Sequence, residues 1–86
     1  MISFPRLESW NTLNKVATIV ATTDDKKRVL CRISMEILID KFGASEEEPM
    51  QSVAEYRTNI EDAARKLIEN KSYEDDGSIL IHADDF

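Results

Sequence analysis

The sequence has little of the residue types that usually build a specialised site: one cysteine, one histidine, two glycines and two prolines among 86 residues. A lone cysteine excludes a disulfide within the chain and fits a reducing compartment. Gly43 and Gly77 are too few for a glycine-rich loop that binds phosphate. No apolar run approaches the roughly 20 residues that span a bilayer. The first five residues also lack the pattern of a secretory signal, so we expect a cytoplasmic protein.

What is present is the composition of one small folded domain over residues 1–86. Apolar residues make up 42% of the chain and charged residues 33%, as is typical of a globular protein. The net charge of −6 is uneven, because residues 1–41 carry seven Lys/Arg against five Asp/Glu, whereas residues 42–86 carry four against twelve. Net acidity disfavours non-specific attachment to the phosphate backbone of nucleic acids.

Two neighbouring segments alternate apolar and polar side chains with a period of two, which predicts β-strands. They span residues 15–22 and 27–34, and a polar segment separates them. Because that segment contains no glycine, we expect an antiparallel hairpin with a longer loop built on a type I turn. In the first strand Ala17, Ile19 and Ala21 share one face, and Val16, Thr18, Val20 and Thr22 share the other. In the second strand Val29, Cys31 and Ile33 share one face, and Arg28, Leu30 and Arg32 share the other.

Two helices are expected to follow the hairpin. At Ser34 the apolar period changes to 3.6 residues, which predicts a helix with Ser34 as its N-cap and Gly43 as its left-handed C-terminal cap. Ser45 and Glu48 have capping-box spacing, which predicts the start of a second, longer helix. That helix would run to about residue 70.

Residues 78–83 form a short apolar run that predicts a third strand. Residues 2–4, closed by Pro5, predict a brief extra strand at a sheet edge. The expected order is β-β-α-α-β, an α+β fold. In it a small, mainly antiparallel sheet carries two helices on one face, as a two-layer sandwich.

Arg57 interrupts the apolar stripe of the longer helix, whose members recur at steps of three and four residues. A cation on the buried face of a helix needs a carboxylate as its partner, and Glu61 stands one helical turn after Arg57. Glu55 and the acidic turn near Asp76 are the other candidates. We predict a structural ion pair of Arg57 with Glu61, and the alternative of a residue that recognises a partner stays open. The stripe consists of Met50, Val53, Ile60, Ala64 and Leu67.

Four basic residues gather on the predicted hairpin, namely Lys26, Lys27, Arg28 and Arg32. A basic two-stranded ribbon can enter a nucleic-acid groove, so these residues are the candidate contact for nucleic acid or for a partner. We favour the other interpretation, a solvated sheet face whose charges discourage pairing of strand edges. If Leu30 and Ile19 lay on that exposed face, it would suit a protein partner better.

No group of residues predicts catalysis, a metal or a cofactor. His82 has no second histidine or cysteine at metal-ligand spacing, so we expect a surface residue. Cys31 shares a strand face with apolar neighbours and is expected to be buried and unreactive. The acidic pairs at residues 75–76 and 84–85 flank the last strand, which favours roles in turns and caps.

Several fragments form a distinctive combination. Ile2-Ser3-Phe4-Pro5 with Ser9-Trp10 is followed by Leu30-Cys31-Arg32-Ile33-Ser34, by Tyr56-Arg57 with Ile60-Glu61, and by Asp76-Gly77. In this combination, which covers nearly the whole chain, the sequence resembles the bacterial domain-of-unknown-function family numbered 1488. The resemblance implies a small single-domain α+β protein. Some members carry a transcriptional-regulator label, but the resemblance implies no activity, cofactor or catalytic residue.

We therefore expect a small cytosolic binding or accessory domain without catalytic activity. It would act through a protein partner or as a homodimer, without a metal or cofactor and away from membranes. The alternative is a nucleic-acid-associated transcriptional regulator that uses the basic hairpin. An enzyme would need a pocket that joins His82 or Cys31 to acidic groups.

Overall fold

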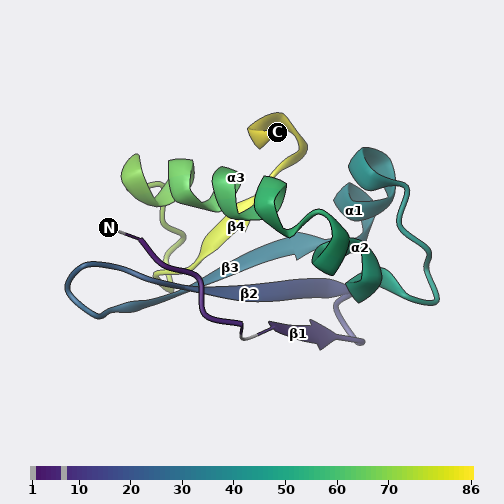
Figure 1. The fold of residues 1–86 in the computed structure, drawn as a ribbon, viewed down its shortest axis with the longest axis horizontal. Helices are drawn as coiled ribbons and strands as arrows, with labels where there is room; N and C mark the ends of the chain where they lie inside the picture. Colours follow the sequence, from purple (N-terminus) through teal and green to yellow (C-terminus); the bar gives the residue numbers. More distant parts are fainter. Residues whose placement is uncertain (1, 7) are drawn as a thin grey trace.

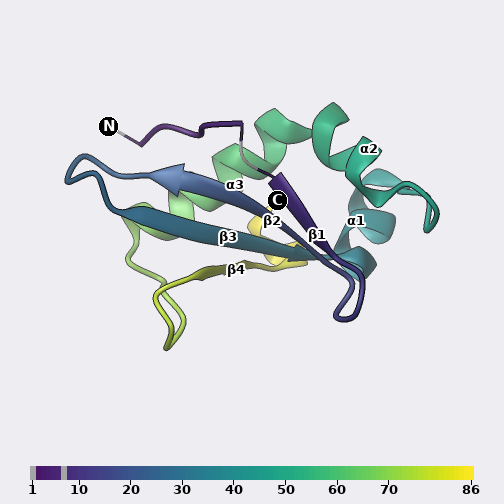
Figure 2. The ribbon, with the colours of Figure 1, turned by 90° about the horizontal axis from the view of Figure 1, so that it is seen from below.

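The computed structural model describes residues 2–6 and 8–86, which form two layers. One layer is a four-stranded sheet, and three α-helices lie across one of its faces (Figure 1). Seen from below, the strands lie in front of the helices, so the opposite face of the sheet carries no helix (Figure 2). The α+β prediction, with helices on one side of a sheet, is confirmed at this level.

The strands stand in the sheet in the order of the sequence: β1 (Glu8–Asn11), β2 (Val16–Thr22), β3 (Arg28–Ser34) and β4 (Ile79–Ile81). β1 and β3 both pair with β2 in the antiparallel sense, whereas β4 is parallel to β3. The prediction of a mainly antiparallel sheet is therefore only partly right. β4 is parallel because the chain leaves the end of β3, crosses through all three helices and returns to the sheet in the same direction.

The alternating pattern of the hairpin sets which side chains enter the core. β2 and β3 pair in register from Val16 opposite Ser34 to Thr22 opposite Arg28. Ile19 stands opposite Cys31, and both are buried beneath the helices. Ile19 therefore does not share the exposed face with Leu30, because Leu30 stands opposite Val20 and neighbouring residues of a strand point to opposite faces. The buried face of these strands consists of Ala17, Ile19, Ala21, Val29, Cys31 and Ile33.

α1 (Met35–Phe42) begins and ends where the sequence predicts. The Ser34 hydroxyl accepts a hydrogen bond from the backbone N–H of Ile37 at 3.4 Å, which satisfies one of the free donors of the first turn. Gly43 has a φ of 65° and donates its N–H to the carbonyl of Ile39 at 2.9 Å. This left-handed cap ends the helix.

The longer helix is in fact two helices, α2 (Pro49–Glu55) and α3 (Arg57–Glu69), and this is a second correction. The backbone at Tyr56 leaves the helical region, with φ −107° and ψ 25°. Its ring stacks on Phe42 of α1, with centroids 4.5 Å apart. The break lets α2 pack against α1 and β2 while α3 lies along β4, which one straight helix would not allow (Figure 1).

Two smaller predictions are also wrong. The second helix begins at Pro49, because the Ser45 hydroxyl accepts from the N–H of Glu47 within the loop and forms no capping box with Glu48. The short N-terminal strand was expected at residues 2–4, but only Ser3 makes a bridge there, to Thr22. The strand at the sheet edge is β1, a few residues later. The observed order is therefore β-β-β-α-α-α-β.

Candidate functional site

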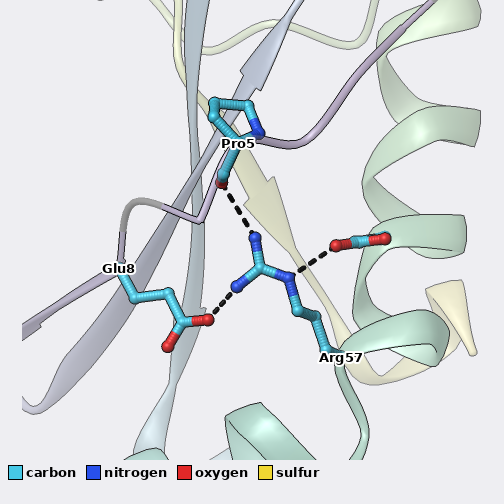
Figure 3. Close-up of polar contacts among 4 residues, drawn as sticks. Pro5, Glu8 and Arg57 are labelled. Carbon is cyan, nitrogen blue, oxygen red and sulfur yellow. Dashed lines mark hydrogen bonds and ion pairs between the residues drawn. The ribbon is translucent and has the colours of Figure 1, made fainter.

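Arg57, the cation in the apolar stripe, joins the first residue of α3 to the N-terminal segment of the chain. Its Nε donates to Oε2 of Glu61 at 2.6 Å, and its Nη2 donates to the carbonyl oxygen of Pro5 at 2.9 Å. Its Nη1 pairs with the carboxylate of Glu8 in β1. Figure 3 shows the guanidinium lying between Pro5 and Glu8, so all three of its nitrogens are used.

This cluster is largely shielded from water. The side chain of Arg57 is 13% exposed, and those of Glu8 and Glu61 are 27% and 22% exposed. Charge-assisted hydrogen bonds are stronger when water is partly excluded. The planar guanidinium holds three acceptors at once, which a lysine ammonium on a flexible stem does less well. The arrangement ties β1 and the segment before it to α3.

The sequence identified Glu61 as the partner of Arg57 but missed Glu8 and Pro5. Glu8 precedes Arg57 by 49 residues, so no helical spacing points to it. The acidic turn near Asp76, which was another candidate, pairs instead with Arg32, with Nη2 and Oδ2 3.4 Å apart. Glu55 has no bond to Arg57 among the described residues.

The face of the sheet without helices, here called the open face, carries two of the four predicted basic residues. Arg28 and Arg32 alternate with the buried residues of β3 and therefore stand on this face together with Leu30. Leu30 is 43% exposed. Val20 of β2 stands opposite Leu30, and Leu80 of β4 is aligned with Arg32. A shallow hollow lined by Leu30 and Arg32 extends from there towards β1.

The other two basic residues, Lys26 and Lys27, lie in the exposed loop between β2 and β3. Asp25 in the same loop accepts a hydrogen bond from the hydroxyl of Thr23, which lowers the pKa of its carboxyl group. Lys26 has a φ of 62°, a conformation that a glycine would adopt more easily. Because Asp24 and Asp25 precede the two lysines, the loop has no net charge. The four basic residues therefore do not form one strongly positive patch, because two lie on the open face and two lie in this neutral loop.

Asp76 is held by Ser78, the residue just before the last strand. The hydroxyl of Ser78 donates to Oδ1 of Asp76 at 2.5 Å, and the backbone N–H of Ser78 donates to the same oxygen at 3.0 Å. These bonds, followed by the nearby Arg32 cation, lower the pKa of Asp76 from its ordinary value. The role of this acidic residue is that of a turn, as its position in the sequence suggested.

Cys31 and His82, the two residues with intrinsic reactivity, lie in different environments, one buried and one exposed. Cys31 is completely buried in the core, and burial raises the pKa of its thiol to about 12. His82 is exposed after β4, where its backbone N–H donates to Oδ2 of Asp85 at 2.7 Å. No group of three or more potential metal ligands occurs within residues 2–6 and 8–86. Over the same residues, no helix has the length and apolar character to cross a membrane.

The comparisons with known proteins place the chain in a family. A model described as "Protein of unknown function (DUF1488)" matches residues 2–81. The structure is similar to the crystal structure of a protein of unknown function from this family in Shewanella loihica PV-4, with a TM-score of 0.82. The two sequences are 22% identical, and the match covers 93% of this chain and 90% of that chain. No curated protein matches. The resemblance seen in the sequence is confirmed, and the chain belongs to the DUF1488 family.

Proposed function

We propose that this protein is a small cytoplasmic binding domain without catalytic activity, and that it acts through protein contacts made by the open face. One observation carries the proposal: the helices cover a single face of the sheet, and the other face presents apolar side chains among charged ones. Leu30 is the exposed apolar residue of β3 on this face, flanked along the strand by Arg28 and Arg32. An apolar centre with a charged rim is the usual composition of a protein interface.

The arrangement of reactive groups supports a role other than catalysis. Catalysis by a nucleophile needs a base within hydrogen-bonding distance and an accessible position. Cys31 is buried and hydrogen-bonds only weakly, to the carbonyl of Val29 at 3.7 Å. The buried free thiol also fits the reducing environment of the cytoplasm.

The second candidate is a nucleic-acid-associated regulator, and the observation in its favour is that Arg28 and Arg32 share the open face. Two features weaken it. Arg32 is already paired with Asp76, and the loop that contains Lys26 and Lys27 is electrically neutral.

A pair of leucine substitutions tests the protein-contact proposal. Leu30→Glu replaces the exposed apolar side chain of the open face by a charge. Leu13→Glu is the matched control, because Leu13 is 91% exposed in the turn between β1 and β2 and does not line the hollow. Light scattering at several protein concentrations measures self-association, and affinity capture from a bacterial lysate measures binding of other proteins. Circular dichroism verifies that both variants fold.

We expect the native protein and Leu13→Glu to form the same dimer or retain the same partner, and Leu30→Glu to lose it. A native protein that stays monomeric and retains no partner would overturn the proposal, as would equal behaviour of the two variants. Titration with duplex DNA at two salt concentrations tests the second candidate. Phosphate contacts require the affinity to fall steeply as the salt concentration rises.

A further inference from the structure

A groove adjacent to the hollow of the open face lies between the turn that follows β1 and the loop that joins α1 to α2. We propose that this groove binds a basic and apolar peptide segment of a partner protein, with a lysine or arginine side chain as its anchor. The groove is lined by Trp10, Pro49 and Met50 and by the three consecutive carboxylates Glu46, Glu47 and Glu48.

The apolar part of the groove consists of residues that are packed against the core. Trp10 stands opposite Ala17 in the register of β1 and β2, so its ring is on the side of the sheet that faces the helices. Trp10 and Met50 pack against the core and remain partly exposed, and Pro49 is buried as the first residue of α2. The indole and the thioether therefore offer an apolar surface that is already in place before a ligand binds, and Pro49 forms the floor beneath it.

The rim of the groove has one sign of charge. Glu46, Glu47 and Glu48 are exposed, and none of them has a side-chain hydrogen bond or ion pair to any residue that the structure describes. The carboxylates that do pair with arginines, such as Glu8, Glu61 and Asp76, do not line this groove. Like charges next to one another on an apolar surface create a local negative potential.

These two parts together select the chemistry of the ligand. An acidic or phosphorylated ligand would be repelled by the rim, and a purely apolar one would gain nothing from the three carboxylates. The side chains of lysine and arginine have an apolar stem and a cationic end, so they satisfy both parts of the groove at once. A guanidinium or ammonium group above the face of an indole gains a further cation–π interaction. Apolar neighbours in the same peptide would contact the exposed part of Met50.

The sequence supplies its own probe, because Trp10 is the only tryptophan in the chain. A capped hexapeptide of alternating arginine and leucine is titrated into the full-length protein, and the emission of Trp10 is followed. A hexapeptide of alternating glutamate and leucine has the same length and apolar content and serves as the peptide control. The test variant is Glu46→Gln/Glu47→Gln/Glu48→Gln. The matched control, Glu55→Gln/Glu69→Gln/Asp84→Asn, removes three carboxylates that do not line the groove.

We expect saturable binding of the arginine peptide and at least tenfold weaker binding of the glutamate peptide. An exposed ion pair contributes about a factor of two in affinity, so the groove variant should bind about eightfold more weakly than the native protein. The control variant should bind within about twofold of native, apart from a small general effect of net charge. Affinity should also fall as the salt concentration rises.

Three results would overturn the proposal: no saturable change with the arginine peptide, equal binding of both peptides, or a groove variant that binds as the native protein does. Trp10 and Thr12 also border the hollow of the open face, so Leu30→Glu is titrated in parallel. Unchanged peptide binding in Leu30→Glu assigns the peptide to the groove. A loss in Leu30→Glu as large as the loss in the groove variant places the peptide on the open face and refutes the inference.

Discussion

Replacing Arg57 by alanine should destabilise the protein by about 2 kcal/mol. The loss of one member of a buried ion pair costs about 3–5 kcal/mol, whereas a fully exposed pair contributes about 0–1 kcal/mol. The side chains of Arg57, Glu8 and Glu61 are 13%, 27% and 22% exposed, so this cluster lies between the two limits. Alanine also removes the methylene stem that packs along the helix. For a small domain with a free energy of unfolding of about 4–13 kcal/mol, the change is large.

Urea denaturation followed by Trp10 fluorescence and by far-ultraviolet circular dichroism measures this change. With a urea dependence of about 1 kcal/mol per M for a domain of this size, the midpoint should fall by about 2 M. Trp10 belongs to β1, two residues after Glu8. If Arg57 anchors β1, the fluorescence transition of Arg57→Ala should precede the transition seen by circular dichroism, because β1 detaches first.

Matched variants separate the ion pair from the packing. Arg57→Met keeps an apolar stem, and Glu8→Gln removes one carboxylate charge, so a double-mutant cycle with both gives the coupling of this pair. We expect a coupling of about 1 kcal/mol or more. Asp62→Ala is the control on the same helix, because it breaks only the exposed pair with Arg65 at 2.8 Å and leaves Arg65 in place over the ring of Phe4; this pair should contribute under about 1 kcal/mol. A loss below about 0.5 kcal/mol in Arg57→Ala would refute the anchoring role.

Two further predictions follow from the pKa shifts. Because hydrogen bonds from Ser78 depress the pKa of Asp76 in the folded state, the stabilisation they give is present above the unfolded pKa and disappears as the pH falls through the folded value. An NMR titration should therefore give the Asp76 carboxyl group a pKa below 3.8 in the native protein and a pKa closer to 3.8 in Ser78→Ala. Identical pKa values in the two proteins would contradict this prediction. Burial raises the pKa of the Cys31 thiol to about 12. At pH 8 a thiol reagent should therefore label Cys31 only as fast as the protein opens. Rapid labelling of the native protein would contradict this, because it would show that the core is accessible.

The parts of the fold that sequence reasoning predicted are those that local patterns determine. Strict alternation predicted which residues of β2 and of β3 share a face, because successive side chains of a strand point to opposite sides of the sheet. Ser34 and Gly43 marked the two ends of α1, because a cap depends only on residues within one turn. Neither prediction needed knowledge of distant contacts.

The parts that were missed depend on contacts between distant segments. β1 contains Glu-Ser-Trp-Asn, which has no apolar alternation, and it forms a strand because it pairs with β2. The break at Tyr56 is invisible in the apolar stripe, because Val53 and Ile60 are seven residues apart and keep the spacing of one continuous helix. The ring of Tyr56 stacks on Phe42, a residue of another helix. Tertiary packing decides both features.

The location of a binding surface was undetermined for a related reason. Alternation divides β2 into two faces but does not state which one the helices cover, and Val16 and Val20 on the open face are as apolar as residues of the core. Arg57, the most conspicuous residue in the sequence, turns inward and joins three segments of the fold. Trp10 and the glutamates before α2 look ordinary in the sequence, and only folding brings them to one groove. A misplaced charge in a sequence pattern is therefore first a constraint on the fold, and surfaces for partners are better sought where covered and uncovered faces meet.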